Sequence, residues 1–165
     1  MSSSGLNCPL LSIPAYYVFS LIPHVYAGSL LSANGYKPNN ANPKASLSPS
    51  AVQGKALDAV FQKYQRAENA QSNNMEQLPL YVAAILASII AKRSTVRGQG
   101  NTAMGQDITG LTPFVASWFA VRTVYNVAYV QISDHTTSFF RSTIWAVGSG
   151  LAGYQIHKAA QILGQ

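Results

Sequence analysis

The sequence predicts an all-α integral membrane protein, folded as a four-helix bundle in a single domain. The chain has 165 residues, a length that is typical of one domain. Only 10% of the residues are charged, whereas soluble globular proteins carry about 25%. Hydrophobic residues make up 48% of the chain and gather in four stretches, which excludes an intrinsically disordered protein.

The first membrane span is expected at about residues 13–31. Residues 1–36 carry no charge, and the apolar segment within them is close to the roughly 20 residues that cross a bilayer. Pro23 lies inside this segment and is expected to kink the helix, because proline offers no N–H to the carbonyl of Phe19. Since the first basic residue is Lys37, the stretch predicts an uncleaved span and not a signal peptide.

A polar loop and a long second helix are expected next. Residues 32–55 are rich in Asn, Pro and Ser, which is typical of a loop. Residues 56–91 are expected to form one helix with an amphipathic start outside the membrane and a spanning part at about 70–91. The basic pair Lys92-Arg93 and the glycine-containing segment 98–100 are expected to end this helix.

The third and fourth spans are expected at about residues 113–132 and 138–163. Thr112 is the expected N-cap of the third span, and Pro113 its first helical residue. Residues 134–137 are expected to form the turn before the fourth span. Small residues one helical turn apart in the fourth span allow another helix to approach closely; they are Gly148 with Ala152 and Ser149 with Gly153.

The net charge of +6 is spread along the whole chain. A nucleic-acid-binding module is excluded because the basic residues form no stripe or cluster. Five basic residues lie in the first loop and the start of the second helix, against three in the second loop, which favours a cytoplasmic first loop. Cys8 is the only cysteine and the three histidines lie far apart, so the sequence predicts no disulfide and no metal site.

Polar side chains on the second helix form a stripe that runs into the predicted span. At about 100° per residue, its four members fall within about 80° of one another; they are Arg66, Asn69, Asn73 and Glu76. Ionisable residues inside a span are costly, so they usually face protein or a wet cavity. The stripe therefore marks a candidate site.

A second polar face is expected on the third helix, where Arg122, Tyr125 and Tyr129 share one side. Arg141 lies in the first turn of the fourth helix. Two interpretations are open at this point. Either Glu76 and Arg122 form an ion pair that only holds the bundle together, or the polar residues of these faces line a site for a polar or anionic ligand.

Three segments resemble the family of membrane-associated proteins in eicosanoid and glutathione metabolism (MAPEG), in particular its microsomal glutathione transferases. The first is residues 66–79, which contain the family's Asn-x-x-Glu element at Asn73 and Glu76. The second is residues 122–129, which are similar to the family's segment with one Arg and two aromatic residues on the third helix. The third is Arg141-Ser142. Their order and spacing agree with the family along nearly the whole chain.

The resemblance implies a homotrimer that binds glutathione as co-substrate between neighbouring subunits, at the membrane boundary. Asn73 and Glu76 would contact the polar backbone of glutathione, with Glu76 suited to its ammonium group. Several family members carry Arg where this chain has Asn69. Arg66 lies one turn earlier and would partly replace that Arg.

The remaining matched positions give the expected chemistry. Arg122, Tyr125 and Tyr129 would hold a carboxylate or line the pocket, and Arg141 would lie at the thiol with Ser142 beside it. A free thiol has a pKa of about 8.5, and a guanidinium that cannot lose its charge favours the nucleophilic thiolate. The resemblance therefore implies a glutathione-dependent transferase or peroxidase that acts on lipophilic electrophiles or lipid hydroperoxides delivered by the bilayer.

Two other functions are open. A non-catalytic lipid-binding or scaffold protein with the same bundle is favoured by the lack of a basic residue near the end of the first helix, where glutathione-binding family members tend to carry Arg. The hypothesis of a small transporter or channel subunit is supported only by the polar residues within the spans. The resemblance implies the endoplasmic reticulum or the mitochondrial outer membrane, and no targeting motif decides between them.

Overall fold

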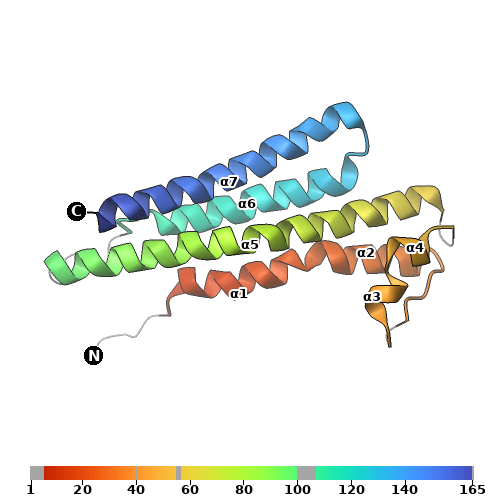
Figure 1. Ribbon diagram of the computed structural model, residues 1–165, viewed down its shortest axis with the longest axis horizontal. Helices are drawn as coiled ribbons and strands as arrows, with labels where there is room; N and C mark the ends of the chain where they lie inside the picture. The colour runs from red at the N-terminus through yellow and green to blue at the C-terminus, as the bar shows by residue number, and fades with distance from the viewer. Residues whose placement is uncertain (1–5, 40, 55–56, 100–106, 165) are drawn as a thin grey trace.

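A computed structural model describes residues 6–39, 41–54, 57–99 and 107–164. The described residues form helices and no strands. The helices are α1 (Cys8–Ser20), α2 (Ile22–Ala33), α3 (Pro43–Ser46), α4 (Pro49–Val52), α5 (Asp58–Gln99), α6 (Leu111–Gln131) and α7 (His135–Leu163). Figure 1 shows α1 and α2 in line on one side of α5, with α6 and α7 on its other side and α3 and α4 at one end. The all-α prediction is confirmed.

The first helical stretch runs from α1 into α2 and is interrupted at Leu21. The N–H of Leu21 bonds to the carbonyl of Val18 at 3.1 Å, and α2 begins at the next residue. Pro23 lies in the first turn of α2, where its missing N–H leaves no helical hydrogen bond unmade. The stretch begins five residues before the predicted Ile13, because the side chain of Asn7 accepts the Leu10 N–H at 3.1 Å and caps α1.

The segment predicted as a plain polar loop contains two short helices. Both α3 and α4 have proline in their first turn, where its fixed φ favours helix formation. The hydroxyl of Tyr36 donates to the carbonyl of Ser46 at 2.5 Å, and the hydroxyl of Tyr64 on α5 donates to the carbonyl of Leu47. These bonds, together with the buried Val52, hold the segment against the start of α5.

The long helix α5 extends further than the sequence predicted. It has 42 residues and passes through Lys92-Arg93 to Gln99, because Lys and Arg are good helix formers and do not stop a helix by themselves. The predicted start at Ala56 lies outside the described residues. Two helical stretches, Cys8–Ala33 and Asp58–Thr95, are long and apolar enough to cross a membrane. That α6 and α7 also cross it stays a prediction.

The start of α6 corrects the predicted cap. Gly110 is the N-cap residue, with a left-handed φ of +67°, a conformation that glycine adopts without strain. The side chain of Asp107 accepts the N–H groups of Leu111 and Thr112 at 2.9 and 2.8 Å. Thr112 is therefore inside the helix, and the carboxylate of Asp107 caps the N–H groups of the first turn.

Helix α7 begins three residues earlier than predicted. Asp134 is its N-cap, and the carboxylate accepts the N–H of Thr137 at 2.9 Å. Of the two small pairs on α7, only Gly148 with Ala152 faces the other helices with both members, whereas in the second pair only Ser149 does, its hydroxyl donating to the side chain of Gln77 on α5 at 3.4 Å. Ala152 is fully buried, and a Cβ at Gly148 would lie 3.6 Å from Val121 on α6. Gly153 of the other pair has nothing within 4 Å of its Cβ position.

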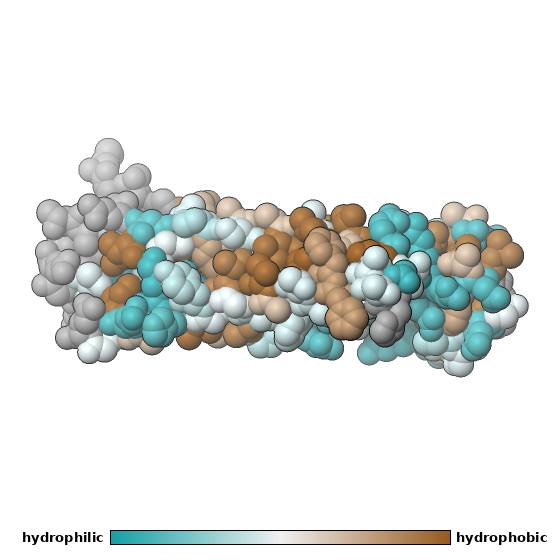
Figure 2. Space-filling model, turned by 90° about the horizontal axis from the view of Figure 1, so that it is seen from above, coloured by the Kyte–Doolittle hydropathy of each residue, from teal (hydrophilic) through white to brown (hydrophobic). Residues whose placement is uncertain are grey.

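An aromatic cluster joins α1, α5 and α6, and Ala152 of α7 packs in the same buried core. Its rings are Tyr16 from α1, Tyr81 from α5, and Phe114 and Trp118 from α6. Hydrophobic side chains also remain on the outside, among them Val18, Val25, Ile90, Val124 and Phe139. On the face seen in Figure 2, hydrophobic residues lie over the middle of the length and hydrophilic ones gather more toward the ends. Such a distribution is expected of a protein surrounded by lipid.

Candidate functional site

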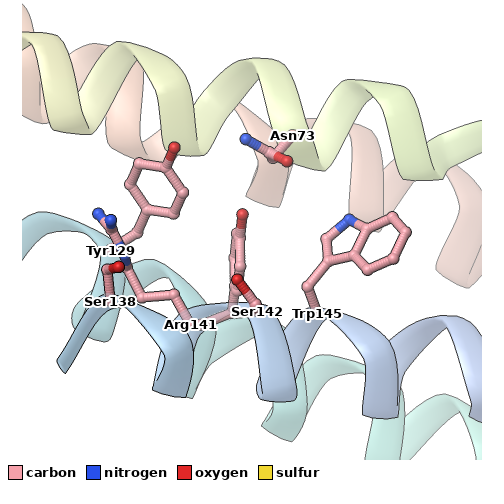
Figure 3. A pocket seen from close by; sticks show the side chains of 7 residues that line it. Asn73, Tyr129, Ser138, Arg141, Ser142 and Trp145 are labelled. Atoms are coloured by element: carbon pink, nitrogen blue, oxygen red, sulfur yellow. The ribbon is translucent and has the colours of Figure 1, made fainter. Parts of the chain in front are cut away.

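A pocket of about 270 Å³ opens where α5, α6 and α7 meet. Five of the eight residues predicted as site residues line it, and two further residues complete it (Figure 3). The five are Asn73 from α5, Tyr125 and Tyr129 from α6, and Arg141 and Ser142 from α7; the further two are Ser138 and Trp145, also from α7.

Helical periodicity explains why these side chains meet. Ser138, Arg141 and Trp145 follow one another at three and four residues along α7, so they lie on one face. Tyr125 and Tyr129 are four residues apart on α6 and share a face in the same way. The chain reverses between the end of α6 and Asp134, which caps α7. The two faces are turned toward each other and line the same pocket.

Arg141 and Tyr129 make the closest charged contact of the pocket. The guanidinium carbon of Arg141 lies 4.5 Å from the centroid of the Tyr129 ring, and Figure 3 shows the two side chains together at one end of the pocket. The Tyr125 ring follows, with its centroid 5.4 Å from that of Tyr129. Arginine keeps its charge at any pH that a protein tolerates, so this end of the pocket carries a fixed positive charge.

Trp145 forms the other end of the pocket, with Ser142 between it and Arg141 (Figure 3). The Trp145 side chain is 40% exposed. The pocket thus combines hydroxyl groups and a cation at one end with a large apolar ring at the other. Such a site suits a ligand with a polar, anionic part and an apolar part.

Asn73 borders the pocket from the opposite side, on α5. Its side-chain amide donates to the carbonyl of Asn69 at 2.8 Å, one turn earlier. Asn69 and Glu76 are exposed on the same face of α5. The predicted polar stripe is therefore an outer surface of the single chain, and only Asn73 of its members lines the pocket.

A model of the MAPEG family matches residues 13–160. The chain belongs to the MAPEG family. This family includes glutathione transferases and peroxidases and eicosanoid synthases, and its members commonly use glutathione. No curated protein and no solved structure matches the chain.

Membership of MAPEG and the two apolar helical stretches indicate an integral membrane protein.

Three predicted site residues of this MAPEG protein do not line the pocket: Arg66, Glu76 and Arg122. Arg66 is half-buried and its Nε donates to the carbonyl of Val130 at 3.0 Å. This bond ties α5 to the end of α6.

Arg122 of this MAPEG protein is fully buried behind the pocket. Its guanidinium carbon lies 4.8 Å from the Trp118 ring and 5.3 Å from the Tyr125 ring. The ion pair between Glu76 and Arg122, which the sequence allowed as a purely structural explanation, is not formed, since Glu76 is exposed and Arg122 faces the interior. Glu68 instead pairs with His24 of α2, with the Nδ1–Oε1 distance at 2.9 Å.

A partly buried amide pair between α5 and α6 was not predicted from the sequence. The side chain of Asn74 donates to Asn126 at 2.8 Å, and the hydroxyl of Tyr16 donates to the carbonyl of Asn74 at 3.3 Å. A signal was present, because the buried residues of this part of α5 recur at helical spacing; they are Ala67, Ala70, Asn74, Gln77 and Tyr81. Ser138 could also have been found, because it precedes Arg141 by one helical turn, as Trp145 follows it.

Proposed function

We propose that this MAPEG protein is a glutathione-dependent membrane transferase or peroxidase that acts on lipophilic electrophiles or lipid hydroperoxides. The observation that carries the proposal is the position of Arg141. Its guanidinium lies in a pocket that also presents an amide from α5 and two tyrosines from α6. This fixed cation is where the reacting sulfur would be bound.

The chemistry follows from the charge of Arg141. A free thiol is mostly protonated at neutral pH, and a nearby cation shifts the equilibrium toward the thiolate by about 1.4 kcal/mol for each pKa unit. The hydroxyl of Ser142 lies beside Arg141 and would donate a hydrogen bond to the sulfur. An electron-rich sulfur at this position is the nucleophile that both proposed reactions need.

Both reactions balance with glutathione as the only co-substrate. In conjugation, the thiolate forms a carbon–sulfur bond and the leaving group departs with the electron pair. In peroxide reduction, the thiolate attacks the terminal oxygen of the hydroperoxide, the O–O bond breaks, and an alcohol and a glutathione sulfenic acid form. A second glutathione then gives the disulfide and water.

The remaining predicted residues would bind the rest of glutathione. Asn73, Tyr125 and Tyr129 line the pocket and would hold the peptide part. Glu76 is exposed on the same face of α5 and would bind the ammonium group of a ligand that extends out of the pocket. Arg66 would offer a cation to a carboxylate farther along this face.

The open polar face of α5 supports the proposal of a homotrimer. Asn69, Asn73 and Glu76 leave the single chain with polar groups on a helix that is long and apolar enough to cross a membrane. Such groups are costly against lipid. A neighbouring subunit that covers this face would complete the glutathione site. We place the assembly in the endoplasmic reticulum membrane, with the mitochondrial outer membrane as the alternative.

Steady-state turnover tests the proposal. The detergent-purified protein is assayed with glutathione and either an activated aryl chloride or a fatty-acid hydroperoxide. We expect turnover that needs glutathione and falls at least about 100-fold in Arg141→Ala, since loss of one charge-stabilising donor costs about that much. Arg93→Ala removes an exposed Arg on the same protein and should change little. Equal activity of Arg141→Ala and the wild type would contradict the mechanism.

A non-catalytic lipid-binding or scaffold protein is the second candidate. One observation favours it: the last turn of α2 holds no basic residue, although glutathione-binding relatives tend to carry Arg there. This function predicts co-purified lipid or fatty acid and no glutathione-dependent turnover with either substrate class. Mass spectrometry of the extracted lipids, run beside the turnover assay, separates the two candidates.

A further inference from the structure

Five side chains form a continuous stacked column from the interior to the pocket. Arg122 lies between the Trp118 and Tyr125 rings, at 4.8 and 5.3 Å from their centroids. The Tyr125 ring continues to Tyr129 at 5.4 Å between centroids. Arg141 closes the column at 4.5 Å from the Tyr129 ring. Two guanidinium groups, one buried and one in the pocket, are thus joined through two tyrosines.

The inner guanidinium is a buried charge without a hydrogen-bonding partner. None of Arg122 is exposed, and its three side-chain nitrogen atoms donate a hydrogen bond to no partner among the described residues. Nor does an acidic side chain pair with it: Glu76 is exposed, and Glu68 bonds to His24. Aromatic faces compensate a buried cation only in part.

Packing alone does not require this arginine. A buried charge contributes less to stability than an apolar side chain of similar volume would at the same position. The neighbourhood would accept such a side chain, because it includes the rings of Trp118 and Tyr125 and also Gly148, whose Cβ position lies 3.6 Å from an Arg122 terminal nitrogen. A residue that is costly for stability and not needed for packing points to a role in the site.

Direct contact with the ligand does not explain Arg122 either. Tyr125 lines the pocket, whereas Arg122 lies behind it and does not. Only 2% of Tyr125 is exposed, so its ring closes the pocket toward Arg122. A charge behind such a wall can act on the pocket only through its electric field, which protein and lipid screen much less than water does.

We propose that Arg122 is a positioning residue whose buried charge acts through Tyr125 on the pocket and, together with Arg141, stabilises the thiolate of bound glutathione. The inference rests on the proposed function. It gives Arg122 a role different from the carboxylate contact that the family resemblance implies. It also explains why the charge is left unpaired, since an acidic partner would cancel its field at the pocket.

The test is a pH titration of thiolate absorbance for glutathione bound to the purified protein. Arg122→Met removes the charge and keeps an unbranched apolar side chain. We expect the apparent pKa of the bound thiol to rise by about one unit, which is about tenfold less thiolate at a pH below both values. Arg93→Met removes an exposed charge and should leave the titration unchanged.

Two further measurements separate a field effect from the alternatives. S-methylglutathione carries the same carboxylates and no ionisable thiol, so its affinity should be the same for Arg122→Met as for the wild type. The thermal midpoint of Arg122→Met should equal or exceed that of the wild type, because an uncompensated buried charge is removed. A structural role would not produce a variant that is at least as stable and forms less thiolate.

Each contrary result has a definite meaning. An unchanged thiol titration in Arg122→Met overturns the inference and leaves the proposed function intact. A loss of S-methylglutathione affinity overturns it in favour of direct contact with the ligand. A variant that fails to fold overturns it in favour of a structural role. Absence of any thiolate signal in the wild type removes the proposed function itself.

Discussion

The guanidinium of Arg141 stacks on the ring of Tyr129, 4.5 Å from its centroid. This contact joins the first turns of α7 to the last turns of α6. The ring supports the guanidinium from one side, so the nitrogen atoms of Arg141 keep their hydrogens for a ligand. The stacking therefore orients the charge without neutralising it.

Tyr129 should matter through its ring more than through its hydroxyl. A cation–π contact at a partly exposed site contributes about 0.5–1 kcal/mol. We expect Tyr129→Leu to lower kcat by up to about fivefold for glutathione-dependent turnover, and Tyr129→Phe to keep most of it. If Tyr129→Phe and Tyr129→Leu reduce kcat equally, the hydroxyl of Tyr129 and not its stacking on Arg141 supports turnover.

Trp145 should set the preference for the second substrate. It provides the large apolar wall of the pocket, opposite Arg141. We expect Trp145→Ala to lower kcat/KM for a bulky apolar electrophile by about tenfold, from lost apolar contact of about 1–2 kcal/mol, with the affinity for glutathione unchanged. Phe140→Ala is the control, because Phe140 is exposed on the same helix and does not line the pocket. Equal effects of the two variants would contradict this assignment.

Asn74 and Asn126 should be coupled in stability. Asn74 is fully buried and donates to Asn126 at 2.8 Å. Asn74→Ala leaves the half-buried Oδ1 of Asn126 without this donor and should cost about 1–3 kcal/mol of unfolding free energy, measured by denaturant titration in detergent. The double variant with Asn126→Ala should cost less than the sum of the single variants. Gln62→Ala, at an exposed position on α5, should be nearly neutral, and strict additivity of the Asn74 and Asn126 variants would argue against the bond.

Asp107 should make stability depend on acid pH. Partial burial would raise the pKa of its carboxyl, but hydrogen bonds from Thr112 and Leu111 and the charge of Lys92 outweigh burial and hold the pKa below its ordinary value. A carboxyl with a lower pKa in the folded state stabilises the protein above the pKa of the unfolded chain, and this contribution is lost as the pH falls through the folded value.

The measurement for Asp107 is the thermal midpoint between about pH 3 and 6, where an Asp carboxyl titrates. The wild type should lose stability toward the acid end. Asp107→Asn cannot titrate and should show a flatter acid limb, whereas Asp58→Asn, in the first turn of α5, should follow the wild type. Parallel curves for the wild type and Asp107→Asn would contradict this role of the carboxylate.

The long helices could be predicted from sequence because their cause is local. Apolar residues at helical spacing fix the positions of α6 and α7 to within a few residues and locate α5, although α5 continues to Gln99, beyond its predicted end at Ala91. The short helices α3 and α4 could not be predicted in this way, because contacts from Tyr36 and Tyr64 hold them. The cap of α6 was missed for a similar reason, since its acceptor is Asp107, several residues before the helix.

The residues of the candidate site could largely be predicted from the sequence. Which of them line the pocket and which are buried behind it could not. Periodicity placed Arg122 and Tyr125 on one face of α6, and both are found there. It could not tell that Tyr125 would line the pocket while Arg122 would lie buried behind it. Depth within a bundle depends on which helix packs against that face, and here Gly148 lets α7 come close to Arg122.

The most direct test of the account is an ultraviolet difference titration of the purified protein with glutathione at neutral pH. We predict a saturable thiolate absorbance that disappears in Arg141→Ala and persists in Arg93→Ala. A signal of equal size in Arg141→Ala would contradict the role of its guanidinium. No signal in the wild type at saturating glutathione would contradict the proposed enzyme and favour the lipid-binding scaffold.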